Sequence, residues 1–159
     1  MAIFADVESQ EPEFATRVRA VFDAHPHTYL ATVRRDGSPR ISGIQLRFVA
    51  GEPWLAGDPG SVKFVDLRRD GRLALHSGNS GPDASDGDAT LSGRAIAVVD
   101  PDERADYAAA AGVTPRHMGV ELFRVELDQV VLIALDEART VPVVTSWRPA
   151  TGLTRTLRT

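Results

Sequence analysis

The sequence predicts a mainly β protein, in which antiparallel strands close into a barrel and a few short helices pack beside them. Seven or so strand-like segments are joined by hairpin-type turns, of which Asp36-Gly37 is the clearest signal. Helices do not alternate with these strands, as a parallel sheet would require. A barrel is favoured because closure removes exposed strand edges. With 159 residues, the chain fits a single domain spanning residues 1–159.

The first third of the chain reads as one helix followed by three strands. The helix is predicted over residues 12–24, because apolar residues recur there on one face (Phe14, Val18, Val21 and Phe22). Strands are expected over 28–34, 39–49 and 53–56, separated by turns at 35–38 and 50–52.

A second helix is predicted over residues 61–69, directly after the dense turn sequence Gly57-Asp58-Pro59-Gly60. Ser61 is its expected N-cap, and Gly71 follows its end. We expect Val62, Val65 and Leu67 to pack against the barrel.

The rest of the chain predicts four more strands, one helix and two further extended segments. Strands are expected over 72–77, 89–99, 120–127, 130–135 and, in extended form, 140–146 and 153–157. A tight turn at Asp128-Gln129 is expected between two of them, and Gly93 indicates a bulge or a close backbone approach. Asp100 as N-cap and Pro101 at the first position predict a helix to about residue 111. The polar segment 78–88 is expected to be an exposed loop.

Composition excludes several classes of function. The net charge of −4 provides no broad basic field for nucleic acid, so we expect no nucleic-acid partner. Without cysteine there can be no disulfide, thiolate metal site or cysteine nucleophile. The start of the chain does not read as a signal peptide, and no apolar run approaches the ~20 residues of a membrane span. We therefore expect a cytoplasmic protein with no membrane partner.

Lys63 is the only lysine in the chain, while the other seventeen basic residues are arginines. It lies at the expected start of a helix, where unpaired backbone N–H groups and the positive end of the helix dipole favour anions. A lysine ammonium meets a phosphate as a compact point charge. This position therefore raises the hypothesis of a phosphate-bearing ligand, against the alternative of an ordinary surface lysine.

Other candidate residues carry weaker signals. His76 ends a strand beside the polar loop and is the one histidine expected to face a pocket; a solvated role is expected for His25, His27 and His117. Asp83, Asp86 and Asp88 lack a glutamate at the spacing of a calcium loop, so no metal site is expected. Trp147 is either a core or interface anchor or a ligand contact.

Several segments together resemble the pyridoxamine 5′-phosphate oxidase-like superfamily. The segment from Leu30 to Arg40 resembles its opening hairpin, and Gly60-Ser61-Val62-Lys63 resembles its Gly-Ser-Arg-Lys helix start. Further similarity lies in Leu91-Ser92-Gly93-Arg94-Ala95, in Leu122 to Leu127, and in the ending from Trp147 to Arg155.

The resemblance implies a homodimeric split β-barrel with cofactor clefts at the subunit interface, holding FMN or the deazaflavin coenzyme F-420. Lys63 and Ser61 would hold the phosphate, assisted by Arg40. The isoalloxazine edge would lie along Ile41, Ser42 and Gly43, with a second wall from Leu55 to Gly57. His76, Ser77 and Trp147 would approach from the barrel or the partner subunit. The cofactor would carry the redox chemistry on a small-molecule substrate.

Three departures from the family pattern limit the assignment. Val62 replaces the arginine between serine and lysine, and Gln45 replaces a second basic residue. The Arg-x-His pair that holds the substrate in true pyridoxamine phosphate oxidases has no counterpart in the stretch from Ile133 to Glu137. We therefore expect an FMN-dependent oxidoreductase that is not a vitamin B6 oxidase, with the substrate unassigned.

Two alternatives remain open from the sequence. An F-420-dependent reductase would need a basic groove for its acidic tail, which could come from four arginines (Arg34, Arg35, Arg68 and Arg69). A protein that only binds a flavin or another small ligand is the second alternative, because no residue is compelling as an acid, base or nucleophile.

Overall fold

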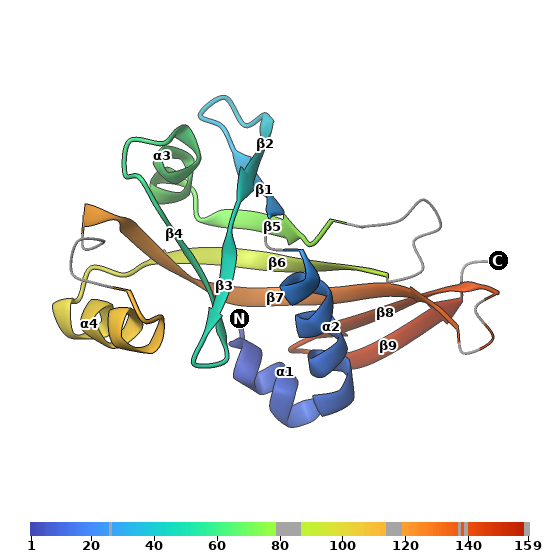
Figure 1. Cartoon of the computed structure of the whole chain (residues 1–159). Coiled ribbons are helices and arrows are strands. Elements are labelled where there is room, and N and C mark those ends of the chain that lie inside the picture. Colours follow the sequence, from blue (N-terminus) through green and yellow to red (C-terminus); the bar gives the residue numbers. More distant parts are fainter. Residues whose placement is uncertain (26, 79–86, 114–118, 137, 139, 158–159) are drawn as a thin grey trace.

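The computed structural model describes residues 1–25, 27–78, 87–113, 119–136, 138 and 140–157. Figure 1 shows long antiparallel strands flanked by short helices. In chain order the elements are α1 (Phe4–Gln10), α2 (Pro12–Ala24), β1 (Thr28–Val33), β2 (Pro39–Ile44), β3 (Leu46–Val49), β4 (Glu52–Gly57), α3 (Val62–Arg69), β5 (Arg72–His76), β6 (Asp88–Ala97), α4 (Pro101–Ala110), β7 (Glu121–Leu135), β8 (Pro142–Arg148) and β9 (Gly152–Leu157).

All described strands belong to one antiparallel sheet, in the order β2-β1-β5-β6-β7-β4-β3. β8 also pairs with β7, and β9 extends this branch. The two ends of the main path, β2 and β3, are consecutive in the chain and are separated only by Gln45. The sheet therefore curves round until its edges meet at one residue, without a hydrogen-bonded ladder between them among the described strands. This is the split β-barrel that the sequence predicts.

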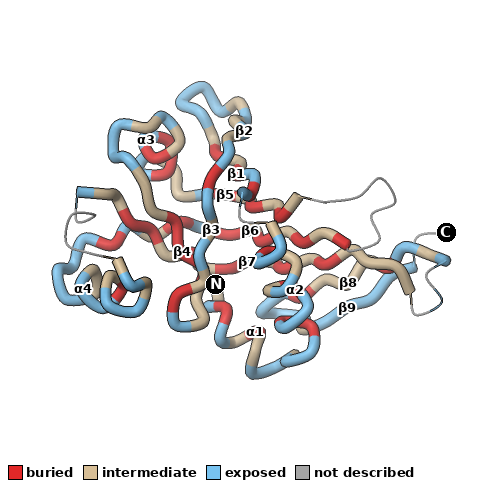
Figure 2. Tube along the Cα trace, in the orientation of Figure 1, coloured by how far each residue is buried: buried red, intermediate tan, exposed pale blue. Residues whose placement is uncertain are grey.

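The interior of the barrel is filled by alternate residues of the strands and by three helices. Leucines from five strands are fully or almost fully buried there (Leu30, Leu55, Leu75, Leu91, Leu127 and Leu132). Phe4, Phe14 and Phe22 bring α1 and α2 onto this core, and Phe64 stacks on Phe123 to attach α3. Figure 2 shows buried positions recurring along β1, β4, β5, β6 and β7.

On the opposite face of the sheet, here called the outer face, α4 packs over β3, β4 and the start of β7. A second apolar cluster joins α4 to this region, with Tyr107 packed 4.9 Å from Trp54 between ring centroids. The predicted cap of α4 is confirmed: Asp100 accepts hydrogen bonds from the amides of Asp102 and Glu103.

Two strand predictions are wrong. The expected strand 39–49 is divided at Gln45 into β2 and β3, because the chain passes there from one edge of the barrel to the other. The tight turn expected at Asp128-Gln129 does not exist, since β7 runs continuously through it. Ser92 pairs with Gln129 but Gly93 pairs with Leu127, so Asp128 is the extra residue of a β-bulge.

Gly93 explains why this bulge can form. A Cβ at this position would lie 1.9 Å from the carbonyl oxygen of Glu126, closer than any side chain could tolerate. The sequence prediction that Gly93 marks a bulge or a close backbone approach is therefore confirmed.

The helix predicted over 61–69 is present as α3, but its buried face differs from the expected one. Phe64, Asp66 and Leu67 are buried, while Val62 and Val65 are 58% and 46% exposed. The expectation that both valines pack was wrong, because the buried stripe of this short helix is centred on Phe64. Ser61 does occupy the N-cap position, yet its side chain caps no backbone amide.

Candidate functional site

The turn before α3 is built so that the helix begins at a fixed place beside β2. Asp58 accepts hydrogen bonds from the amides of Gly60 and Ser61, which holds the turn closed. As in any α-helix, the amides of the first turn, those of Val62 and Lys63, have no acceptor within the helix. The Ser61 hydroxyl is buried and has no hydrogen-bond partner among the described residues.

Lys63 projects from this first turn toward β2. Its ammonium donates a 2.9 Å hydrogen bond to the carbonyl oxygen of Gly43. No described carboxylate lies within salt-bridge distance of it, so none of the described acidic residues neutralises the charge of the only lysine. The structure thus brings together Ser61, Lys63 and Gly43, three of the residues that the sequence proposes for the cofactor.

Arg40 also lies on β2, but its side chain is held by a carboxylate of α3. Its Nε donates a 2.7 Å hydrogen bond to Oδ2 of Asp66, which also accepts 3.0 Å from Thr32 Oγ1. Burial alone would raise the pKa of Asp66, but the bonds from Arg40 and Thr32 and the charges of Arg40 and Arg69 outweigh it and lower the pKa below its ordinary value. As placed, the Arg40 guanidinium is engaged inside the protein.

A row of cross-strand neighbours runs from β2 across the outer face. Gly43 is opposite Tyr29, and Tyr29 is opposite His76 on the next strand. Tyr29 is 57% exposed and Ile41, two residues before Gly43, is 75% exposed. A Cβ at Gly43 would meet nothing within 4 Å, so the surface beside the Lys63 ammonium is open. Ser42 has the opposite orientation, since alternate residues of a strand point to opposite faces.

His76 is fixed by two neighbours at the end of this row. Its Nδ1 accepts a 3.0 Å hydrogen bond from the amide of Gly78. Its Nε2 lies 3.5 Å from Oδ1 of Asp88. Because Nδ1 is an acceptor, the proton of the neutral ring lies on Nε2 and points toward the carboxylate.

Three predicted site residues are buried behind this surface. Leu55 and Trp147 belong to the interior core, and the Trp147 indole N–H donates 3.2 Å to Gln10 Oε1. Ser77 is also fully buried; its hydroxyl accepts from the amide of Ala89 and donates to the carbonyl of Gly78. These side chains support the strands that carry the exposed residues.

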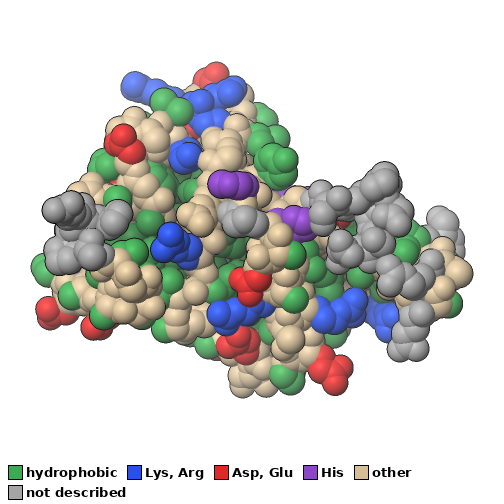
Figure 3. Space-filling model, viewed as in Figure 1, with side chains coloured by type: hydrophobic (Ala, Val, Ile, Leu, Met, Phe, Trp, Pro, Cys, Tyr) green, Lys and Arg blue, Asp and Glu red, His purple; other side chains and the backbone are tan. Residues whose placement is uncertain are grey.

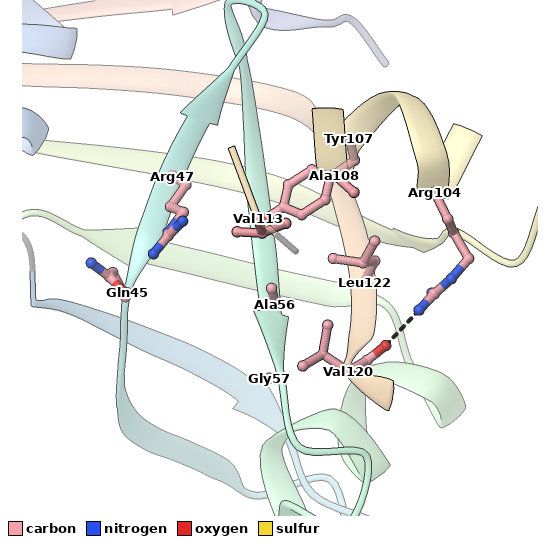
Figure 4. A pocket seen from close by; sticks show the side chains of 10 residues that line it. All are labelled: Gln45, Arg47, Ala56, Gly57, Arg104, Tyr107, Ala108, Val113, Val120 and Leu122. Carbon is pink, nitrogen blue, oxygen red and sulfur yellow. Dashed lines mark hydrogen bonds between the residues drawn. The ribbon is translucent and has the colours of Figure 1, made fainter. Parts of the chain in front are cut away.

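Gly57 connects this region to a cavity of about 290 Å³ that lies under α4. A Cβ at Gly57 would lie 2.6 Å from the Phe64 ring, so the glycine allows β4 and α3 to pack closely. Figure 4 shows the cavity between β3, β4, β7 and α4. Gly57 lines it together with Ala56, and both belong to the wall that the sequence predicts from Leu55 to Gly57.

The sequence reasoning missed Asp66, Arg47 and Tyr107. Asp66 is buried against Arg40, and Arg47 and Tyr107 line the cavity. No local pattern marks these residues, because the contacts join separate segments of the chain. Only the helical spacing from Lys63 to Asp66 could have indicated that a carboxylate shares the helix with the lysine.

Two further findings concern charge and ligand classes. Figure 3 shows Lys and Arg side chains at several separate places on the visible face, some of them around the tip of the β1–β2 hairpin. No group of three or more metal-ligating side chains lies together in the part of the chain that the structure describes.

Within that same part, every helix is too short or too polar to cross a membrane. Asp83, Asp86 and His117 lie outside it.

The sequence model of the pyridoxamine 5′-phosphate oxidase family matches residues 14–139 of this chain. No curated protein matches the sequence significantly.

Solved structures share the fold at low sequence identity. PhzG from Burkholderia lata, in complex with tetrahydrophenazine-1-carboxylic acid, is 17% identical, with a TM-score of 0.65 over 98% of this chain and 95% of that one. A pyridoxamine 5′-phosphate oxidase-related, FMN binding protein from Nostoc punctiforme is 11% identical, with a TM-score of 0.62 over 94% of this chain and 96% of that one. A heme binding protein from Mycobacterium smegmatis is 14% identical, with a TM-score of 0.60 over 89% and 86%. At these identities the similarity establishes the fold alone.

Proposed function

Because this chain belongs to the pyridoxamine 5′-phosphate oxidase family, we propose that it is an oxidoreductase that binds FMN beside Lys63. The observation that carries this proposal is the Lys63 ammonium, which has no described carboxylate partner and lies at the first turn of α3 over an open stretch of β2. The FMN binding relative from Nostoc punctiforme supports the choice of cofactor.

The residues around the start of α3 fit a phosphate group. The ammonium of Lys63 and the first-turn amides of Val62 and Lys63 are donors that a phosphate can engage together. The Ser61 hydroxyl is an orphaned polar atom, and a change of its rotamer would let it donate to the same oxygens. Arg40 would act indirectly, because Asp66 already holds its guanidinium.

We place the isoalloxazine along the outer face of β2, next to Ile41 and Gly43, with the backbone of β4 near Gly57 as its second wall. Tyr29 and His76 continue this surface on β1 and β5. Leu55, Ser77 and Trp147 would support it from within, and Ser42 would do so through its backbone. FMN, when bound, supplies hydride or electron transfer, while the protein orients it and excludes water.

We further propose that the chain acts as a homodimer through the uncovered part of the outer face. Residues there that point away from the core are small or only weakly polar and partly exposed (Ala31, Ala74, Thr90, Ser92 and Val131). Ile41 and Tyr29 add large exposed apolar groups at its edge. A second copy would cover this surface and enclose the cofactor between two chains.

The substrate is not expected to be a B6 vitamer. Residues 133–135, where the substrate-holding Arg-x-His pair would be expected, are the apolar Ile133, Ala134 and Leu135 at the end of β7. None of them can bind a phosphate through its side chain.

F-420 remains the alternative cofactor, although the structure commits two of the four arginines once proposed for its tail. Arg68 pairs with Glu121, and Arg69 donates to the carbonyl of Val33. A non-catalytic flavin carrier is the other alternative.

The absorbance spectrum of the freshly purified protein, followed by titration of the apoprotein with FMN and F-420, tests the proposal. A flavin band or tight FMN binding is the expected result. Binding of F-420 alone would replace FMN by the deazaflavin, and binding of neither would refute the cofactor site. Stopped-flow reoxidation of the reduced holoprotein by quinones or nitro compounds distinguishes an oxidoreductase from a non-catalytic flavin carrier, because a carrier would reduce none of these acceptors.

A further inference from the structure

We propose that the cavity under α4 binds a small, largely apolar molecule that carries one carboxylate. Its role as the substrate pocket rests on the proposed function, but the binding site itself does not. Figure 4 shows the cavity enclosed by side chains from β3, β4, β7 and α4, on the outer face of the barrel. Its volume of about 290 Å³ is close to the lower end of the usual range for ligand pockets, roughly 300–1,000 Å³.

The walls of this cavity are mainly apolar. Five aliphatic side chains line it, two from α4 and the segment after it, two from β7 or just before it, and one from β4 (Ala108, Val113, Val120, Leu122 and Ala56). Such walls gain free energy by excluding water from an apolar ligand, without fixing its orientation.

The polar groups of the cavity are concentrated in four side chains, none of them acidic. Gln45 lies just before β3 and Arg47 lies on it, while Arg104 and Tyr107 come from α4. All ten described lining residues are neutral or basic, in a chain whose net charge is −4. A local excess of positive charge in an acidic protein selects an anionic ligand.

The two arginines differ in what they can offer. Arg104 donates to the carbonyl oxygens of Val98 and Val120, at 3.1 and 2.7 Å, and so ties α4 to β7 and the end of β6. Arg47 has neither a carboxylate partner nor a hydrogen bond among the described residues, and its charge is close enough to act on the Tyr107 hydroxyl. Arg47 is therefore the cation available to a ligand.

One available guanidinium sets the charge of the ligand. A carboxylate carries one negative charge and is matched by Arg47 in a planar, bidentate geometry, with the Tyr107 hydroxyl and the Gln45 amide as further donors. A phosphate monoester carries about −1.5 to −2 at neutral pH and would be left partly uncompensated. Burial raises the pKa of Tyr107, with Arg47 acting weakly in the opposite sense, so the hydroxyl remains a proton donor at neutral pH.

Isothermal titration of the purified protein at pH 7 with naphthalene-2-carboxylate tests the proposal. The neutral naphthalene-2-carboxamide and the dianionic 2-naphthyl phosphate are matched probes of the same ring system. The carboxylate should bind at least about tenfold more tightly than either, because a hydrogen-bonded charge pair adds that much. Equal binding of carboxylate and carboxamide, or tighter binding of the phosphate ester, would overturn the proposed ligand class.

Variants locate the binding. Arg47→Gln should weaken binding of the carboxylate at least about tenfold and leave binding of the carboxamide unchanged. Arg35 is an exposed arginine on the β1–β2 turn, so the control variant Arg35→Gln should change neither affinity. Ala108→Phe should fill the cavity from α4 and abolish binding of both probes, with an unchanged circular dichroism spectrum as evidence of folding. Carboxylate binding that survives Arg47→Gln and Ala108→Phe would contradict the site.

The same titrations separate this inference from the proposed function. If the protein binds the carboxylate but neither FMN nor F-420, the carboxylate site is supported and its role as a substrate pocket is refuted. If it binds FMN but not the carboxylate, the proposed oxidoreductase is supported and the carboxylate site is refuted.

Discussion

Arg40 Nε and Asp66 Oδ2 are 2.7 Å apart, and this ion pair joins β2 to α3 in a place that is largely screened from solvent. The side chain of Asp66 is 8% exposed and that of Arg40 is 24% exposed. Thr32 and Arg69 complete the surroundings of the carboxylate. The pair fixes the position of the helix from which Lys63 reaches Gly43, so the geometry of the proposed cofactor site depends on it.

Replacing Asp66 by Asn should lower the free energy of unfolding by about 2 kcal/mol, because Arg40 would lose its charged partner in a mostly buried position. Urea unfolding at pH 7 measures this difference. Asp70→Asn is the matched control, since its partner Arg72 is 60% exposed, and it should cost clearly less. Equal effects of the two variants would show that the Arg40–Asp66 pair contributes no more than a surface pair.

The stability difference between the wild type and Asp66→Asn should vanish in acid. The pKa of Asp66 in the folded state is below its ordinary value of 3.8, so the folded protein takes up this proton less readily than the unfolded chain. The contribution is therefore fully present above about pH 3.8 and is lost as the pH falls through the lowered pKa. Urea unfolding from pH 6 downward checks the sign, and a difference that grows on acidification would contradict it.

The contact between Gly93 and the Glu126 carbonyl predicts that Gly93→Ala is strongly destabilising, by about 3 kcal/mol or more. The added Cβ would meet backbone, which cannot move without breaking the ladder between β6 and β7. Thermal unfolding followed by circular dichroism measures the loss. Gly119→Ala is the control, because a Cβ there meets nothing within 4 Å. A mild effect at Gly93 would mean that the bulge at Asp128 can rearrange.

The proposed dimer predicts a mass twice that of one chain in sedimentation equilibrium. Ala74→Arg should shift the protein toward the monomer, since this residue points outward from the middle of the uncovered face. Ala109→Arg, on the exposed side of α4, makes the same chemical change away from that face and should leave the mass unchanged. A monomeric wild type would refute the dimer, and a dimeric Ala74→Arg would place the interface elsewhere.

The parts of the fold with local signals could be predicted from the sequence, and the parts held by distant contacts could not. The Asp36-Gly37 hairpin and the Asp100-capped α4 carry their signals within a few residues. The helix α1 does not, because its first amides are bound by Glu52, which lies on β4. The bulge at Asp128 has the local composition of a turn, and it becomes a continuous strand only because Gly93 lies opposite.

The candidate site follows the same rule. Lys63 stands out in the sequence because it is the only lysine and lies at the expected start of a helix, so the phosphate hypothesis needed no structure. The capture of Arg40 by Asp66 depends on the packing of α3 against β1 and β2, which no local pattern reports. The cavity with Arg47 and Tyr107 is assembled from four separate segments, so no local pattern could indicate it.

The most direct test of the central claim is a comparison of FMN with riboflavin, which lacks only the phosphate, in the wild type and in Lys63→Gln. Flavin fluorescence titration of the apoprotein gives the four affinities. The substitution should weaken FMN binding by about 1.5–3 kcal/mol, the strength of a hydrogen bond to a charged group, and leave riboflavin binding unchanged. Arg35→Gln, the control for net charge, should leave both affinities unchanged. Equal losses for both flavins, or no loss of FMN affinity, would contradict the phosphate site at Lys63.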